Sequence, residues 1–566
     1  MQLLKNLRAL LGAGLALSMS ACGGGGGADG TQRATSLGAV AGVEAAGALA
    51  WKGIPYAQPP VGALRWKAPV AAEPWSGTRV ADRFGSACIQ NGRIYGPGQN
   101  NTYDGTIATS LGTPVGSEDC LTLNVWRPAG NATGLPVIFF VYGGSNISGY
   151  TADPVYDGAA LARAAHAVVV TANYRVGPFG FFNLAQLKGG TDAAEDSGNF
   201  ALLDLIQALK FVQANATVFG GNPGNVTLMG QSAGAINVWA LLTSPLATGL
   251  FHKAVPLSGG ISLASNLATG TIPTLNPAST SAAQADALLA KLLVADGTAA
   301  DDAGAQAWVA GHTAAEVAAY VRSKDAGVIL TTLLAGGLTG SGPIPDGTVV
   351  PVDPIAAIAA GQYNRMPVLA GNTSEEGKLF APFLALLGGP PGFKIDDATR
   401  FNLMASFDPD AAPTLSEADI LDPAYVPSDA PATGWTAKAN LLASVFMAPS
   451  RDNVLDTLLT QQPQVWYYRF DWAQEPAPWN TVYGAAHAFD LPFLFGNFGP
   501  SLFANAANST ANAPGRLALS AAMMASLGAF ARTGDPNTPA LGATWETWPA
   551  RMVFDATQTQ ARITPE

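Results

Sequence analysis

The stretch 225–242, NVTLMGQSAGAINVWALL, decides the fold of this 566-residue chain. Residues 226–229 form a short apolar run typical of a buried strand, and 235–242 are compatible with a helix. Between them lies Gly-Gln-Ser-Ala-Gly at 230–234, the only G-x-S-x-G in the sequence. A sharp turn from strand to helix holds such a serine in a strained conformation with its hydroxyl exposed. The pattern therefore predicts that Ser232 is a nucleophile; the alternative is an ordinary serine in a glycine-rich turn.

Other apolar runs of strand length alternate with helical patterns along the chain. Apolar residues recur at helical spacing in 199–216, and alanine-rich helical patterns occupy 280–335 and parts of 395–460. This alternation predicts an α/β fold with a central, mainly parallel sheet flanked by helices, and the alanine-rich segments are expected to be cap insertions. The further strands that we expect are 136–142, 167–173, 366–370 and 464–470.

The composition excludes several classes of protein. Lys and Arg total 29 and Asp and Glu total 40, so the formal net charge is −11, which argues against a nucleic-acid partner. Charged residues make up 12% of the chain and hydrophobic residues 48%, which excludes charge-driven disorder and a long coiled coil. Three cysteines are too few for a disulfide-dense scaffold or a four-cysteine zinc site.

The first residues have the pattern of an export signal. Basic residues precede an apolar run at 9–19, which is too short to span a bilayer. Residues 19–22, Met-Ser-Ala-Cys, resemble the lipobox of bacterial lipoproteins, although methionine stands where those proteins prefer leucine. We therefore expect a lipoprotein signal peptide at 1–21 and lipidation of Cys22. The alternative is ordinary cleavage near Ala21, which would leave Cys22 as a free thiol.

The segment after the signal separates it from the rest of the chain. Residues 22–34 include five consecutive glycines and are expected to form a flexible tether, followed by a single catalytic domain at 35–566. The mature protein is expected to be exported. It would be a cell-envelope lipoprotein that contacts the membrane only through Cys22, or a periplasmic or secreted protein if Cys22 is not lipidated. The oligomeric state is not readable from the sequence.

A serine hydroxyl becomes a good nucleophile when a base, normally a histidine held by a carboxylate, takes its proton. In α/β-hydrolases these residues follow the order Ser, acid, His along the chain. His166 precedes Ser232 and is expected to start a strand, His252 is expected to pack beside the serine turn, and His312 is expected to be exposed to solvent. Elimination leaves His487, in a loop late in the chain.

The acid is expected in the turn that follows the strand 366–370. Glu375 and Glu376 are both eligible there. A solvated turn carboxylate without a catalytic role is the alternative for each.

The oxyanion hole requires backbone N–H groups aimed at the developing negative charge. Gly143 and Gly144 follow a predicted buried strand, and Ala233 follows the nucleophile. These residues are our candidates for the oxyanion hole, and a simple turn at the end of the strand is the alternative for the two glycines.

Several longer motifs occur together and are highly specific. They resemble the type-B carboxylesterase family, the cholinesterase-like branch of the α/β-hydrolases, and the resemblance extends from about residue 48 to the C-terminus. The motifs are WKGIPYA (51–57), PPVG (59–62), SEDCLTLNV (117–125), NYRVGPFG (173–180), FGGNP (219–223) and TGDPN (533–537).

The resemblance implies roles that the residues alone leave open. In the family the acid is the glutamate immediately before a glycine, which corresponds to Glu376, and the histidine corresponds to His487. The oxyanion hole corresponds to the three residues proposed above. The resemblance also implies that Ser258 supports the buried acid and that Cys88 and Cys120 form a disulfide.

The sequence departs from the family at informative positions. Gln231 stands where the family usually has glutamate, and Tyr142 stands where many members have histidine. Cholinesterases carry a choline-binding tryptophan between the paired cysteines, but no tryptophan occurs between Cys88 and Cys120. The cysteines of the second disulfide of the animal enzymes are absent. A choline ester is therefore not expected, and a neutral ester is favoured.

The combined signals predict a serine carboxylesterase that hydrolyses small-molecule neutral esters through an acyl-enzyme, without a metal or cofactor. A second hypothesis is a specialised exported hydrolase of bulky esters, carbamates, phthalates or polyesters, because the sequence does not reveal the pocket size. A third is a non-catalytic cholinesterase-like binding protein, which is disfavoured because all three triad candidates are present.

Overall fold

The computed structural model describes residues 30–338 and 341–566. The expected signal peptide at 1–21, Cys22 and most of the expected tether lie outside the described residues. The expected start of the domain at residue 35 needs correction, because Gln32–Ala34 already forms strand β1 and pairs with β2 (Ala39–Ala41). The backbone hydrogen bonds of this pair make residues 32–34 part of the folded domain and not of a tether.

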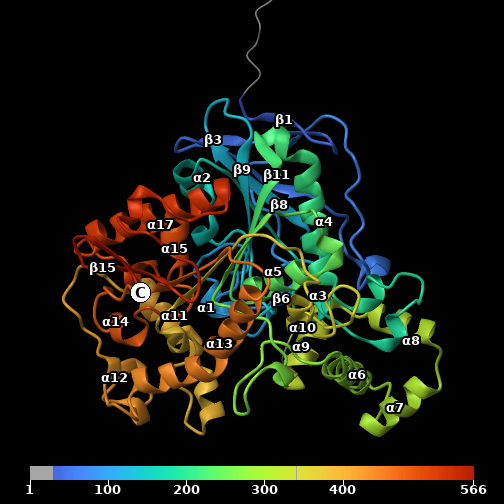
Figure 1. Ribbon diagram of the computed structural model, residues 1–566. Coiled ribbons are helices and arrows are strands. Elements are labelled where there is room, and N and C mark those ends of the chain that lie inside the picture. Colours follow the sequence, from blue (N-terminus) through green and yellow to red (C-terminus); the bar gives the residue numbers. More distant parts are fainter. Residues whose placement is uncertain (1–29, 339–340) are drawn as a thin grey trace, which may run out of the picture.

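A large twisted sheet occupies the centre of the molecule (Figure 1). Its strands are β3 (Val43–Ala45), β4 (Ala48–Pro55), β8 (Thr122–Pro128), β9 (Leu135–Val141), β10 (Val168–Ala172), β11 (Gly221–Gln231), β12 (Lys253–Leu257), β13 (Val368–Thr373), β14 (Val465–Phe470), β15 (Met552–Ala556) and β16 (Ala561–Pro565). Within the described residues the sheet has 11 strands in the order β16-β15-β14-β13-β12-β11-β9-β10-β8-β4-β3. The neighbours from β15 to β10 pair in parallel, and the pairs at both edges are antiparallel.

The prediction of a mainly parallel sheet is therefore confirmed, and each expected strand is present with ends shifted by a few residues at most, apart from β11, which starts earlier. The central strands β9 and β10 of the sheet are fully buried, because helices cover both faces of the sheet. Five short strands of the described residues lie outside the large sheet. They are β1 and β2 with β5 (Thr78–Val80), which pairs with β2, and the pair β6 (Gln90–Asn91) and β7 (Pro114–Val115).

Helices pack on the two faces of the sheet. Figure 1 shows α2, α15 and α17 on one side and α4 on the other. The covering helices are α2 (Ala159–Ala165), α4 (Phe200–Asn215), α5 (Ala233–Thr243), α15 (Leu491–Phe495) and α17 (Ala513–Thr533), and shorter ones are α1 (Ile107–Ser110), α3 (Gly177–Gly180), α10 (Pro354–Ala359), α14 (Trp479–Val482) and α16 (Ala504–Ala507). The expected helix at 199–216 is α4.

A buried ion pair fastens the NYRVGPFG motif to α4. Arg175 Nη2 lies 2.7 Å from Asp204 Oδ1, and both side chains are almost completely buried. Arg175 Nε also donates to Asp204 Oδ2 at 2.8 Å, so the two planar groups form a bidentate pair. Burial raises the pKa of Asp204 and the adjacent guanidinium opposes that rise. Loss of either partner would leave a buried charge without compensation.

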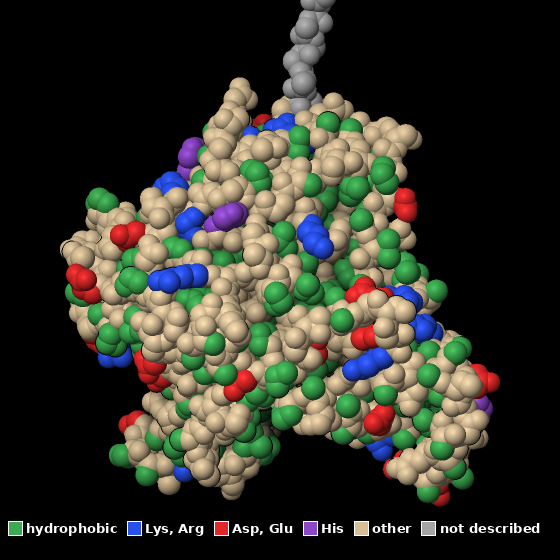
Figure 2. Space-filling view, turned by 45° about the vertical axis from the view of Figure 1, so that its right-hand side comes forward, with side chains coloured by type: hydrophobic (Ala, Val, Ile, Leu, Met, Phe, Trp, Pro, Cys, Tyr) green, Lys and Arg blue, Asp and Glu red, His purple; other side chains and the backbone are tan. Residues whose placement is uncertain are grey.

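Two groups of helices form the cap (Figure 1). One follows β12 and contains α6 (Ala278–Ala295), α7 (Asp302–Ala310), α8 (Ala314–Ser323) and α9 (Ala326–Ala335); the other follows β13 and contains the 3-10 segment η8 (Glu376–Leu387), α11 (Asp397–Ser406), α12 (Glu417–Ile420) and α13 (Trp435–Leu459). In Figure 2 they appear as two lobes with a hollow between them, and charged side chains are scattered over this face. None of the helices in the described part of the chain has the length and apolar character needed to cross a membrane.

Candidate active site

The nucleophile candidate sits at a tight turn between β11 and α5. Ser232 has φ 59° and ψ −125°, a conformation that is strained for a residue with a side chain. Its N–H donates to the carbonyl of Leu257 on β12 at 2.8 Å, which holds the turn against the sheet. A side chain at Gly234 would collide with the carbonyl oxygens of Val141 and Tyr142, so only glycine fits there. The predicted strand, serine turn and helix are all present.

The acid and base candidates come from two loops that lie far apart in the sequence. Glu376 begins η8 shortly after β13, and His487 lies in the loop between α14 and α15. His487 Nδ1 donates a hydrogen bond to Glu376 Oε2. The two residues are 2% and 3% exposed respectively, so the pair is shielded from water.

The surroundings of Glu376 favour its ionised form. Burial by itself raises the pKa of this carboxyl, but the charge and hydrogen bond of His487, and the nearby polar groups of Ser258 and Asn372, bring the pKa below its usual value. Asn372 Nδ2 and the Thr373 N–H donate to Oε1 at 2.8 and 3.0 Å. Ser258 is buried beside β12, although its hydroxyl has no hydrogen bond of good geometry among the described residues.

The two glutamates that the sequence left as alternatives have different partners in the structure. Glu375 forms an ion pair with Lys378 at 2.6 Å and accepts a hydrogen bond from the Ala485 N–H at 3.0 Å. Glu375 therefore bonds to the backbone of the loop that carries His487 and does not contact the imidazole. Glu376 is the carboxylate that contacts His487.

The remaining histidines lie elsewhere. His166 caps the C-terminus of α2 in the left-handed conformation, and β10 begins only at Val168, so the expectation that it starts a strand was wrong. Histidine is among the residues found in this conformation more often than most. His252 accepts a hydrogen bond from the Val226 N–H at 3.2 Å beside β11, and His312 is exposed and stacks on Trp308.

Of the two glycines proposed for the oxyanion hole, Gly143 lies against the nucleophile turn, and Gly144 packs against Ser148 in its own loop. A Cβ atom at Gly143 would come within 2.8 Å of Ser232 Cβ and of the Gln231 carbonyl oxygen. Only a glycine backbone can approach this closely, so its position suits an N–H donor near the serine. Asn146 and Asn237 connect this loop with α5 through two reciprocal amide hydrogen bonds, at 2.9 and 3.3 Å.

The disulfide expected between Cys88 and Cys120 is present, with the two Cα atoms 4.9 Å apart. It places Gln90 next to the glycine loop. Gln90 Nε2 donates to the Gly149 carbonyl at 2.9 Å, and the Gly149 N–H donates back to Gln90 Oε1 at 2.8 Å. The disulfide loop thus contacts the backbone of the glycine loop at Gly149.

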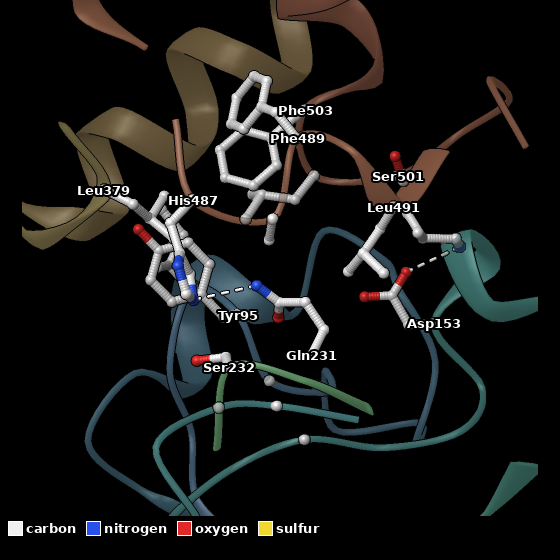
Figure 3. Close-up of a pocket in the computed structure, with 18 of the residues that line it drawn as sticks. Tyr95, Asp153, Gln231, Ser232, Leu379, His487, Phe489, Leu491, Ser501 and Phe503 are labelled. Atoms are coloured by element: carbon white, nitrogen blue, oxygen red, sulfur yellow. Dashed lines mark hydrogen bonds between the residues drawn. The ribbon is translucent and has the colours of Figure 1, made fainter. Parts of the chain in front are cut away.

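A pocket of about 250 Å³ opens above Ser232. His487, Gln231 and Gly144 line it, and Figure 3 shows Phe489 and Phe503 across the pocket from Ser232. Aromatic side chains dominate the wall, and charged groups reach it from loops and from α11. The aromatic ones include Tyr95, Phe380, Phe383, Phe489 and Phe503, and the charged ones are Arg93, Asp153, Asp397 and Arg400.

Comparison with known proteins shows the family of the chain. The sequence model of the Carboxylesterase family matches residues 29–564, which is nearly the whole chain. The chain belongs to the carboxylesterase family. The para-nitrobenzyl esterase of Bacillus subtilis (strain 168) is 33% identical over 531 residues, covering 91% of each chain. The fumonisin B1 esterase of Sphingopyxis macrogoltabida is 34% identical over 479 residues, covering 83% of this chain and 75% of that one.

Solved structures agree with the sequence comparison. A carboxylesterase of Geobacillus stearothermophilus superimposes with a TM-score of 0.69 at 28% identity, covering 95% of this chain and 98% of that one. A PNB esterase gives the same TM-score and identity, covering 95% and 97%. The α/β-hydrolase fold is therefore confirmed, and this carboxylesterase is a carboxylic ester hydrolase.

Several contacts in this carboxylesterase were not foreseen from the sequence. Gln231 Nε2 lies 3.1 Å from His487 Nε2 (Figure 3). Gln231 stood out as a departure from the family, but its contact with a residue 256 positions away carries no local signal. Gln90, Asn146 and Asn237 were not singled out either, because an amide that bonds to a distant loop looks like any other polar residue in the sequence.

Proposed function

We propose that Ser232, His487 and Glu376 catalyse ester hydrolysis in two acyl-transfer steps. Ser232 Oγ attacks the ester carbonyl carbon while His487 Nε2 takes its proton. The tetrahedral intermediate collapses, the bond to the alcohol oxygen breaks, and His487 returns the proton to that oxygen. Water then attacks the acyl-enzyme by the same route and releases the acid and the free serine. Glu376 stays ionised and stabilises the imidazolium that forms in each step.

The backbone N–H groups of Gly143, Gly144 and Ala233 would bind the oxyanion of each intermediate. Their proposed role is supported by the close approach of Gly143 to Ser232 and by the place of Ala233 as the first residue of α5. Donors aimed at such an oxyanion are each worth about 3 kcal/mol of barrier.

The observation that carries the proposal is the buried contact of His487 with Glu376 beside the strained serine turn. We test it with Ser232→Ala, measuring hydrolysis of p-nitrophenyl butyrate. We expect turnover to fall by about 10⁴-fold or more while the unfolding transition is preserved. A fluorophosphonate probe should label the native enzyme and not the variant. Retained turnover in the variant would refute the assignment of the nucleophile.

For the substrate, we propose a neutral ester with an apolar or aromatic portion. The aromatic wall of the pocket supports this choice, and so does the neutral Gln231 beside the nucleophile, which offers no charge to a cationic group. Two relatives are named as esterases of para-nitrobenzyl and fumonisin B1, so a bulky ester remains our second candidate. A series of p-nitrophenyl esters graded by acyl length, and of butyrates graded by alcohol size, tests both. The specificity constant should rise with apolar size up to the limit of the pocket.

We also propose that the protein is exported and anchored through a lipid on Cys22. The support is the lipobox-like sequence at 19–22 and the glycines that follow it. Cys22→Ser should move the enzyme from the membrane fraction to the soluble fraction of the cell envelope without changing its turnover number. If the unaltered enzyme is already soluble, the anchor is wrong and the signal is an ordinary export signal.

A further inference from the structure

The amide of Gln231 contacts the ring nitrogen of His487 that would receive the Ser232 proton. Because His487 Nδ1 bonds to the carboxylate of Glu376, which can only accept, Nδ1 carries the ring proton and Nε2 of the neutral ring is an acceptor. The N–H of Gln231 Nε2 therefore donates to His487 Nε2 across 3.1 Å. Among the described residues no hydrogen bond joins Ser232 Oγ to this nitrogen. Gln231 and Ser232 thus compete for the same lone pair.

The site holds the Gln231 amide close to the imidazole. Gln231 is the last residue of β11 and only 3% of it is exposed. Its Oε1 lies toward the glycine loop, since a Cβ atom at Gly143 would come within 3.1 Å of it. His487 is also held, by Glu376 and by the ring of Phe380, whose centroid is 4.7 Å from that of the imidazole. In such an enclosed site a single hydrogen bond has more effect on proton affinity than in water.

This contact favours one protonation state of His487. A proton on Nε2 would face the N–H donor of Gln231, and the favourable contact would be lost unless the amide turned its oxygen to the ring. A donor to the neutral form of a base stabilises that form relative to the charged one. A glutamate at the same position would act in the opposite direction, because its carboxylate attracts and accepts from the imidazolium.

We infer that Gln231 is a positioning residue that holds His487 neutral, with Nε2 as an acceptor, and so keeps the base competent at lower pH than a carboxylate at residue 231 would allow. The inference rests on the proposed function, in which His487 is the general base. Residue 231 is a position where this chain departs from the usual family pattern, so the departure should have a measurable effect on the pH dependence of the enzyme.

Other charged and titratable groups lie near His487 or line the same pocket, and they stay the same when only residue 231 is changed. A comparison among variants of residue 231 therefore isolates its own contribution. The neighbouring groups are Glu376 after β13, Asp490 in the loop of His487, Tyr468 on β14, Arg451 on α13, and Arg93, Asp153, Asp397 and Arg400 on the pocket wall.

The experiment compares the acidic limb of the kcat/KM profile for p-nitrophenyl butyrate in three enzymes. Gln231→Met keeps the length of the side chain but has no donor, and Gln231→Glu replaces the donor by a negative acceptor. We expect the midpoint of the acidic limb to rise by about half a pH unit in Gln231→Met and by about one unit or more in Gln231→Glu. The control Gln461→Glu adds the same charge at a surface site, where the amide bonds to the Ala359 carbonyl, and should leave the midpoint unchanged.

A second measurement guards against variants that fold poorly. The rate of Ser232 labelling by a fluorophosphonate, followed over the same pH range, needs little protein and no turnover, and Gln231→Asn offers a shorter amide with a weakened contact. The labelling midpoints should follow the order native, Gln231→Asn or Gln231→Met, then Gln231→Glu. Coincident midpoints, or the reverse order, would overturn the inference while leaving Ser232-dependent hydrolysis intact. Loss of the dependence on Ser232 itself would instead refute the proposed function.

Discussion

Asn146 and Asn237 exchange two amide hydrogen bonds, at 2.9 and 3.3 Å, and so join the glycine loop of the proposed oxyanion hole to the helix that follows the nucleophile. Both side chains are almost fully buried, and Asn146 adopts a left-handed backbone conformation with φ 57°. The pair links the two sources of the proposed oxyanion donors, Gly143 and Gly144 on one side and Ala233 on the other. Small displacements of such donors have large effects on rate.

Removal of one member of this pair should therefore slow catalysis. In Asn237→Ala we expect kcat to fall by about tenfold to 100-fold with a smaller change in KM, because the donors act mainly on the transition state. The unpaired amide of Asn146 should also lower the free energy of unfolding by about 1–3 kcal/mol. The control is Asn183→Ala, which removes a largely buried amide bond to the Ala278 carbonyl away from the site. It should lose stability but keep kcat, and an equal loss of kcat in both variants would count against a role for the pair.

The two adjacent glutamates should behave differently when their charge is removed. Glu376→Gln should lower kcat by about 10⁴-fold, because a neutral amide supports neither the imidazolium nor the correct tautomer. Glu375→Gln should lower kcat by less than about threefold, because its partners are Lys378 and the Ala485 N–H and not the imidazole. Steady-state kinetics of the two variants on one ester decide the matter. The reverse pattern would make Glu375 the catalytic acid.

The disulfide should contribute both stability and support for the glycine loop. Cys88 and Cys120 are separated by 32 positions, and the loss of such a cross-link is expected to cost about 3–4 kcal/mol through the entropy of the unfolded chain. We expect the paired Cys88→Ser and Cys120→Ser variant to unfold at a clearly lower urea concentration. Gln90→Leu, which keeps the disulfide but removes both bonds to Gly149, should instead reduce kcat at nearly native stability. A Gln90 variant with native kcat would show that the glycine loop does not need this support.

Asp153 should make the binding of anionic esters depend on pH. This carboxyl lines the pocket, and burial raises its pKa to about 6, although the hydrogen bond from the Val155 N–H opposes the rise. Below that pH it is neutral, and above it a negative charge faces the substrate, while Arg93 and Arg400 lie on the same wall in both states.

We therefore expect KM for an ester whose acyl chain ends in a sulfonate to rise relative to KM for a neutral ester of equal length. The increase should be about threefold to tenfold between about pH 5 and about pH 7.5. In Asp153→Asn the ratio of the two KM values should stay flat over this range. A native enzyme with a flat ratio would show that Asp153 does not sense the substrate charge.

The order of elements and the site of the nucleophile follow from local sequence. The strand at 226–229, the glycines around Ser232 and the helix after it are close neighbours in the chain, so sterics and hydrophobic periodicity determine the turn without distant contacts. The alternation of strands and helices predicted the parallel sheet for the same reason. Elimination among four histidines indicated His487, which the structure places against Glu376.

The tertiary structure alone decided which groups meet. The sequence could not choose between Glu375 and Glu376 from their neighbours, and the choice depends on how the loop of His487 packs over β13. Gln231 contacts His487, and Gln90 forms two hydrogen bonds with Gly149, although in each case the two residues are far apart in the chain. The residues that line the pocket also come from distant segments. Such contacts depend on the packing of the whole domain, so a local pattern of residue types does not predict them.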